Sequence, residues 1–297
     1  MQFYGDNVPK CVPPPDYMQR TNLSMFRVGV LLLLLLQGGL CAQTNFYVSP
    51  TFSEAFLEFG NQERERIFFD YGNLYNCNNV KNFGVVLIGA GILANTEMDH
   101  NFQRWYGKHI RSGATNDFSK VSKQFGEGII FVPMMAGAAL TYRFSQRKWG
   151  LQECTLGEFT DRSARGYLVG APALFTFQRL LGGARPCNGN SYWRPFRREN
   201  SVSGHAFMGA VPFITAAQMT DNPCIKGLFY TLSVFTGWSR VNDDRHYLSQ
   251  VVLGWYLAYL SVRAVSMTES INPLPQGLTI FPVCGDGSIG IGLHMQY

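Results

Sequence analysis

Six apolar segments, separated by polar connections, follow one another through most of the chain. They span residues 83–95, 128–142, 166–181, 205–219, 225–238 and 249–266. Their lengths and the lack of strict apolar–polar alternation favour helices over strands. In the last segment Val252, Tyr256 and Tyr259 recur at helical spacing, which is typical of a helix with one buried face. The pattern therefore predicts a bundle of about six core helices.

The regions on either side of these segments have a different pattern. Residues 43–82 are mixed and aromatic, and the stretch FLEFGNQERERIFFDYGNLY predicts one amphipathic helix there. The tail LTIFPVCGDGSIGIGLHMQY has a Gly-Asp-Gly turn between apolar runs, which is typical of a β-hairpin. We therefore predict an all-α fold with a small C-terminal β-hairpin. The helical core is expected at 83–268, between an N-terminal region at 43–82 and a tail at 269–297.

The N-terminus has the pattern of a secretory signal peptide. From Met25 the chain reads MFRVGVLLLLLLQGGLCAQ, with one arginine, a short leucine-rich core and small residues that favour cleavage after Ala42. The 24 residues before Met25 are interpreted as an upstream extension. A lipid anchor at Cys41 is the alternative, although the bulky Leu40 precedes it. Residues 1–42 are thus expected to direct export and to be removed.

Composition leaves the choice between membrane and aqueous surroundings open. Charged residues make up 15% of the chain, and phenylalanine is abundant at 23 residues. This low charge favours membrane association, whereas short helices with polar interruptions favour a periplasmic protein. The net charge is +5, but the basic residues are scattered, so we expect no nucleic-acid partner. No C-x-x-C pair is present, so neither a zinc site nor a redox motif is expected, and disulfide pairing stays open.

Three short polar stretches lie where predicted helices begin or end. They are FQRLLGGARP at 177–186, SVSGHAF at 201–207 and SRVNDDRHYLSQ at 239–250. Arg185 and Arg240 carry planar guanidinium groups, which bind tetrahedral oxyanions through paired hydrogen bonds. Residues 203–205 precede a predicted helix, whose first N–H groups favour an anion. Of the two histidines, His205 and His246, one can attack phosphorus while the other protonates the leaving oxygen.

These stretches resemble the signature of the type 2 phosphatidic acid phosphatase superfamily, which includes bacterial acid phosphatases and vanadium-dependent haloperoxidases. Its pattern is Lys-x6-Arg-Pro, then Pro-Ser-Gly-His, then Ser-Arg-x5-His-x3-Asp, and the likeness covers roughly residues 166–266. The resemblance implies that His246 is the nucleophile and His205 the general acid, and that the phosphatase branch needs no metal. It also implies that the phosphoryl oxygens are held by Arg185, Ser203, Gly204 and Arg240.

The sequence departs from that pattern at three positions. Gln178 stands where the family has lysine, and the neighbouring Arg179 could supply the missing cation. Val202 replaces proline. Gln250 replaces aspartate four residues after His246, on the same face of the expected helix. Its carbonyl oxygen can accept the Nδ1 proton of the imidazole, provided that the amide is oriented oxygen-first, but it cannot neutralise charge on the ring.

The resemblance implies an exported, metal-independent phosphatase of the acid phosphatase or phosphatidate phosphatase type, without a cofactor. Its substrate would be a lipid phosphate or a small phosphate ester, and a phosphohistidine would form during turnover. One alternative is a haloperoxidase that holds vanadate in the same site. The other is a phosphate-binding or scaffold protein without activity, which Gln178 and Gln250 favour.

Several polar residues outside the motifs are expected to have structural roles. His100, His109 and His294 are interpreted as surface or structural residues. Asp243 and Asp244 are expected to cap a helix or to face solvent. The loop around Trp193, with its three arginines, either borders the pocket or packs as an ordinary surface loop.

Overall fold

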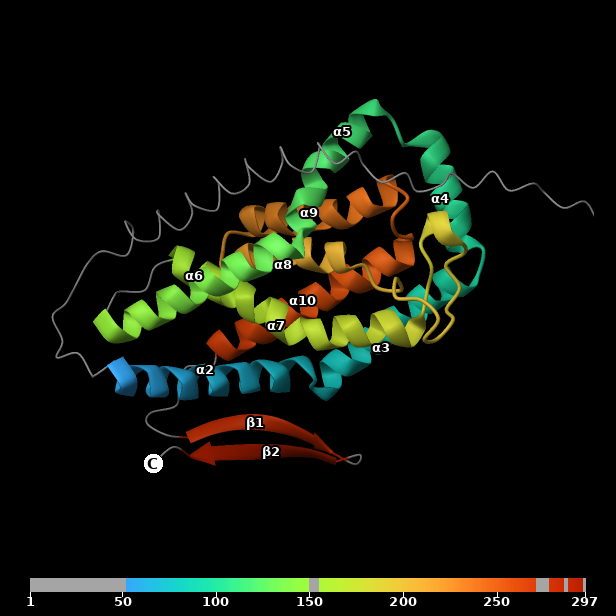
Figure 1. Cartoon of the computed structure of the whole chain (residues 1–297). Coiled ribbons are helices and arrows are strands. Elements are labelled where there is room, and N and C mark those ends of the chain that lie inside the picture. Colours follow the sequence, from blue (N-terminus) through green and yellow to red (C-terminus); the bar gives the residue numbers. More distant parts are fainter. Residues whose placement is uncertain (1–51, 150–154, 271–277, 286–287, 296–297) are drawn as a thin grey trace, which may run out of the picture.

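The computed structural model describes residues 52–149, 155–270, 278–285 and 288–295 (Figure 1). These residues form nine α-helices, two short 3-10 helices and two strands. The α-helices are α2 (Phe52–Leu74), α3 (Cys77–Asn95), α4 (Met98–His109), α5 (Gly113–Ser122), α6 (Gly128–Trp149), α7 (Thr155–Leu181), α8 (Gly204–Gln218), α9 (Pro223–Asn242) and α10 (Leu248–Ser270). The 3-10 helices are η1 (Lys123–Gly126) and η2 (Pro186–Asn188).

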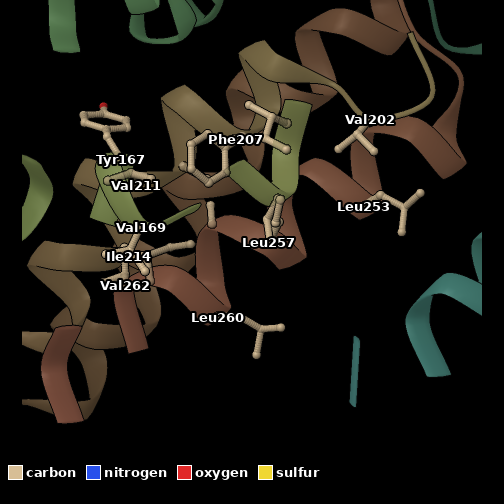
Figure 2. Close-up of a cluster of buried hydrophobic side chains, with 14 of the residues drawn as sticks. Tyr167, Val169, Val202, Phe207, Val211, Ile214, Leu253, Leu257, Leu260 and Val262 are labelled. Carbon is tan, nitrogen blue, oxygen red and sulfur yellow. The ribbon is translucent and has the colours of Figure 1, made fainter. Parts of the chain in front are cut away.

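The core lies around α8, which packs against α7, α9 and α10. Figure 2 shows its side chains Phe207, Val211 and Ile214, all fully buried, among apolar residues of α7 and α10. Two glycines allow the close approach of these helices. A Cβ at Gly209 would lie 2.4 Å from the side chain of Thr236 in α9, and one at Gly254 would lie 2.4 Å from the carbonyl oxygen of residue 203. The start of α8 is therefore held directly against α10.

The predicted fold class requires a correction in the number of helices. All six apolar segments lie inside α-helices, but the described chain has nine α-helices rather than about six core helices. Two of the additional ones, α4 and α5, are short and carry polar residues on most faces. They form because they pack on the loop between α9 and α10, and an apolar run of the core type is not needed for that contact.

Strand structure is confined to the C-terminal residues of the described chain. Strand β1 (Leu278–Gly285) runs antiparallel to β2 (Ser288–Met295), with Leu278 opposite Met295 and Gly285 opposite Ser288. Between Phe52 and Ser270 the described residues contain no strand. The part of the molecule that carries the three polar motifs is thus entirely helical.

Three helices are long and apolar enough to cross a membrane, by length and composition. They are Cys77–Asn95, Gly128–Gln146 and Leu248–Ser270. These helices are compatible with membrane association of the protein. The predicted signal peptide, residues 1–42, lies outside the described residues. Among those that are described, Cys77 and Cys187 are disulfide-bonded, while Cys224 is a free, exposed thiol.

Candidate active site

The three polar motifs meet where α7 and α9 end and α8 and α10 begin (Figure 1). The backbone N–H of Ser203 donates to the carbonyl oxygen of Gln250 at 2.9 Å, which joins the second motif to the third. The side-chain Nε2 of Gln250 donates to the carbonyl oxygen of Ala184 at 2.7 Å, which joins the third motif to the first. Segments separated by more than 60 residues therefore share one buried glutamine.

The backbone around Gln250 fixes the orientation of its amide. Its Oε1 accepts from the backbone N–H of Tyr247 at 3.2 Å, and its Nε2 donates to the Ala184 carbonyl. Because a backbone N–H can only donate and a carbonyl can only accept, the amide cannot be turned around. The same Oε1 lies 2.9 Å from Nδ1 of His246. The Nδ1 atom therefore carries the proton, and Nε2 has a free lone pair.

His246 is buried and is held in its neutral form. Its pKa is lowered to about 3, mainly by burial and in part by the positive charges of Arg240, Arg185 and His205, against the opposing effect of the Gln250 hydrogen bond. These groups act on His246 because the fold has gathered them around its ring. The imidazole is consequently unprotonated at any ordinary pH, as a nucleophile has to be.

Three arginines gather at this end of the bundle. Burial lowers the pKa of Arg240 to about 10, and the nearby charges of Arg245 and Arg185 contribute, against the raising effect of Asp243. Burial and Arg245 also lower the pKa of Arg185. Nε of Arg240 is buried without a hydrogen-bond partner among the described residues. Arg185 donates through Nε to Asn200 Oδ1 at 2.8 Å, which orients its guanidinium group. Mutual repulsion of these cations makes the cluster a strong site for an anion.

The start of α8 supplies backbone donors next to the arginines. Ser203 is the N-cap, with its hydroxyl accepting from the N–H of Ala206 at 3.3 Å. Gly204 and His205 occupy the first two helical positions, so their N–H groups have no partner within α8. The helix dipole adds partial positive charge at the same place. An oxyanion at this helix end would thus meet both backbone donors and guanidinium groups.

His205 is half exposed and faces a carboxylate that the sequence did not reveal. Its Nε2 lies 3.7 Å from Oε1 of Glu127, at the junction of η1 and α6. A hydrogen bond from His205 lowers the pKa of Glu127, against a smaller effect of burial. Glu127 is therefore ionised, and it lies beside the histidine that is predicted to be the general acid.

Two other predicted phosphate-binding residues already have partners within the protein. Gln178 uses its Nε2 to donate to the carbonyl oxygen of Val202 at 2.9 Å, so it supports the loop before α8. Arg179 has a side chain that is 69% exposed and forms an ion pair with Glu199 at 3.0 Å. Arg179 therefore does not replace the lysine expected at 178. Arg245, next to His246 in sequence, is the third cation of the cluster instead.

The loop between Arg240 and His246 is held by side chains of α4 and α5. Asp243 accepts from Ser119 of α5 at 2.7 Å, and Asp244 accepts from Gln103 of α4 at 2.6 Å and from Arg111. The two aspartates are thus neither simple caps nor freely solvated.

Asp99 of α4 reaches the first turn of α10. It is fully buried and accepts from both the N–H and the hydroxyl of Ser249. Asp99 thereby caps α10, the helix that carries Gln250 and begins two residues after His246.

These supporting residues could not be recognised from the sequence, because each lies far from the motifs in the chain. Glu127, Asp99 and the polar residues of α4 and α5 follow no spacing rule. Among the other predictions, His109 is exposed, with Nδ1 2.9 Å from the Trp105 carbonyl oxygen, and His100 is partly buried. The side chain of His294 lies outside the described residues.

A comparison with family models is consistent with this arrangement. The model of the PAP2 superfamily matches residues 162–270, which include most of α7, all of α8, α9 and α10, and every residue of the three motifs. No curated protein and no solved structure matches the chain. The superfamily generally comprises phosphoester hydrolases, and the match does not specify a branch. It confirms the predicted resemblance of residues 162–270 to the type 2 phosphatidic acid phosphatase superfamily.

Proposed function

We propose that the protein is an exported phosphatase that hydrolyses a phosphate monoester without a metal, through a phosphohistidine at His246. The single observation that carries this proposal is the state of His246. Its Nδ1 is held by Gln250 Oε1 at 2.9 Å, its pKa is lowered to about 3, and the cations that lower it are those expected to bind phosphate. A neutral imidazole beside an anion site is suited to attack on phosphorus.

In the first step the lone pair of His246 Nε2 attacks phosphorus, and the bond from phosphorus to the leaving oxygen breaks. His205 gives its proton to that oxygen, so the alcohol departs neutral. Arg240, Arg185 and the N–H groups at the start of α8 hold the phosphoryl oxygens, where charge builds up in the transition state. Arg245 supplies a positive charge in place of the family's lysine, which is Gln178 in this chain.

In the second step a water molecule attacks the phosphohistidine. His205, now neutral, takes a proton from the water, and the bond between phosphorus and Nε2 breaks. Inorganic phosphate leaves, while His246 is again neutral and His205 again protonated. The carboxylate of Glu127, 3.7 Å from Nε2 of His205, orients the imidazole in both steps.

Two features support export. Cys77 and Cys187 are disulfide-bonded, and disulfides form and persist outside the reducing cytoplasm. The N-terminal sequence has the composition of a signal peptide with a cut after Ala42. Three helices compatible with a membrane favour a protein held at the outer side of the membrane that it crosses.

The decisive experiment is trapping of radiolabelled phosphate on the protein by an alkaline detergent quench during turnover of a labelled monoester. We expect an acid-labile, alkali-stable label on the wild-type protein and none on His246→Ala. The matched control is His109→Ala, because His109 is an exposed histidine outside the site. A label that persists in His246→Ala would contradict the proposal.

The same preparation separates the alternatives. A phosphatase releases phosphate from p-nitrophenyl phosphate or phosphatidate in the presence of EDTA, and vanadate inhibits it. A haloperoxidase oxidises halide once vanadate is added. An inactive scaffold protein releases no phosphate, and His246→Ala changes nothing. Halide oxidation or the absence of turnover would each overturn the proposed phosphatase.

A further inference from the structure

The connection between α7 and α8 begins and ends at the candidate active site. Arg185 near its start donates to Asn200 near its end at 2.8 Å. Its middle is fixed to the end of α7, since the N–H of Phe196 donates to the carbonyl oxygen of Arg179 at 2.9 Å. Gly182, with φ at 67°, leaves room for the carbonyl oxygen of Arg194, which would lie 1.8 Å from a Cβ there. The turn Arg194–Arg198, here called the basic turn, therefore has a defined place beside the site.

The basic turn exposes all five of its residues, RPFRR. Phe196 is 78% exposed and has φ at 63°, a conformation that is an outlier for a bulky residue. None of the three arginines has a carboxylate partner among the described residues, although Arg198 donates to the carbonyl oxygen of Asn188 at 3.0 Å. An exposed aromatic ring between arginines that lack carboxylate partners indicates a binding surface for a partner that is both apolar and anionic.

The loop that carries the basic turn is attached to the end of a helix with an exposed apolar face. Ser191 donates to the carbonyl oxygen of Ala94 at 2.8 Å, and the N–H of Trp193 donates to Asn95 Oδ1 at 2.9 Å. The ring of Trp193 packs at Gly91. These three contacts are all in the last turns of α3, one of the helices able to cross a membrane.

The exposed face of α3 is apolar from Val85 to Ile92, where its large side chains are Val85, Ile88 and Ile92. Its first turns also expose the polar residues Asn78, Lys81 and Asn82 beside Val80. A helix of 19 residues is about 28 Å long, close to the ~30 Å hydrocarbon thickness of a bilayer. A tryptophan at the end of the span and arginines beyond it match the order of side chains at a membrane surface. The basic turn would then lie at the depth of the lipid headgroups.

We propose that the basic turn docks on the surface of an anionic bilayer, with Phe196 inserted at the boundary of the acyl chains and Arg194, Arg197 and Arg198 at the headgroups. The docking itself is independent of the proposed function, and only its consequence for the substrate rests on that function. Because Arg185 lies at the base of the same loop, docking places the anion site next to lipid phosphates. A bilayer accounts for the apolar face of α3, the exposed phenylalanine and the unpaired arginines together.

The first test compares a membrane substrate with a soluble one. The full-length protein is reconstituted in vesicles of phosphatidylcholine with phosphatidylglycerol, and kcat/KM is measured for phosphatidate in the vesicles and for p-nitrophenyl phosphate. The double variant Arg197→Gln/Arg198→Gln should lower the ratio of the two about 30-fold, from about 1 kcal/mol for each arginine at an anionic surface. Phe196→Ser should lower it as well, and the soluble substrate should be unaffected.

The matched control removes two exposed cations elsewhere, Arg64 on α2 and Lys120 on α5, as Arg64→Gln/Lys120→Gln. It should leave the ratio unchanged. High salt should reduce the wild-type ratio toward that of the double variant, since screening weakens the attraction to the headgroups. An unchanged ratio in both loop variants would overturn the docking proposal, while hydrolysis of the soluble substrate would still support the phosphatase.

The second test requires no turnover. The variant Phe196→Trp places a fluorescent side chain in the basic turn. Its emission is obtained by subtracting the fluorescence of the wild-type protein in the same vesicles from that of the variant. We expect lipids brominated in their acyl chains to quench this difference and acrylamide to leave it unaffected. Quenching by acrylamide alone would show that residue 196 faces water and would overturn the proposal. If the wild-type protein hydrolyses neither substrate, the proposed function fails, and this test still decides the docking.

Discussion

Buried arginines gather at both ends of the helical bundle, but their surroundings are opposite. Arg165 in α7 binds Asp70 of α2 through two hydrogen bonds of 2.7 Å, whereas Arg240 has no carboxylate partner among the described residues. The two ends lie about 28 Å apart along α10, from Gln250 to Glu269. The cluster around Arg165, here called the ionic cluster, comprises Glu63, Arg66, Asp70, Arg143, Glu158, Asp161, Arg162, Arg165 and Glu269.

The pKa shifts of the two arginines show the physical difference. Burial lowers the pKa of Arg165, but the hydrogen bond and charge of Asp70 outweigh it, so the net shift is upward. Burial lowers the pKa of Arg240 to about 10, and neighbouring arginines add to the effect. The ionic cluster is therefore satisfied by the protein itself, whereas Arg240 keeps its Nε without a partner among the described residues and, in the proposed function, would donate to a bound anion. An arginine stabilises the fold in one place and creates a binding site in the other.

The largest expected effect on stability is at the ionic cluster. Arg165→Met leaves Asp70 buried without its partner, and the free energy of unfolding should fall by about 3–5 kcal/mol. Denaturant unfolding measures this loss. The kcat of the folded protein should stay at the wild-type value, because Arg165 lies far from the site. A loss of kcat without a loss of stability would contradict the assignment of a purely structural role to Arg165.

The converse change is expected to affect activity and not stability. Arg240→Met removes a donor to the phosphoryl oxygens, and kcat/KM should fall about 10³-fold, as for other transition-state donors. Because Arg240 is buried with Nε unpaired, its replacement by an apolar side chain should leave the free energy of unfolding unchanged or raise it. The measurement pairs steady-state kinetics with urea unfolding. Destabilisation by 3 kcal/mol or more would mean that Arg240 is structural.

Acid should weaken the active-site end through His246. Its pKa is about 3 in the folded protein, below the ordinary 6.5, so protons bind preferentially to the unfolded chain between these values. Stability is therefore full above pH 6.5 and decreases as the pH falls, by about 1.4 kcal/mol per unit from this group. Unfolding measured at pH 6.5 and 4.5, without phosphate or sulfate, should show about 3 kcal/mol less difference in His246→Asn than in the wild type. His109→Asn, at an exposed site, serves as the control.

The smallest of these effects concerns the orientation of the nucleophile. Gln250→Leu removes the acceptor for Nδ1 of His246 and leaves the Ala184 carbonyl and the Tyr247 N–H without partners. We expect kcat to fall about 10²-fold, from the loss of the correct tautomer, with a loss of about 1–3 kcal/mol in stability. Gln250→Glu retains an acceptor oxygen and should keep more activity than Gln250→Leu. Equal activity of the two variants would exclude a role for Gln250 in fixing the tautomer of His246.

Much of the helical core could be predicted because burial leaves a periodic pattern. All six apolar segments lie in helices, and the amphipathic stretch before them lies in α2. The helices α4 and α5 were missed for the opposite reason. Gln103 of α4, Ser119 of α5 and Arg111 between these helices form hydrogen bonds with the loop at 241–245, and polar contacts of this kind have no periodicity. The placement of Arg179 could not be predicted either, because its ion-pair partner, Glu199, lies 20 residues further along the chain.

The sequence by itself determined the chemical groups of the candidate site, since Arg185, Ser203, His205, Arg240 and His246 lie in motifs with fixed spacing. Only the tertiary structure decided how these groups are used. It oriented the amide of Gln250, placed Glu127 beside His205 and left Arg240 without a carboxylate while it paired Arg165 with Asp70. Spacing along a helix fixes which residues share a face. The partners of a buried charge come from other helices, and only the folded chain brings them together.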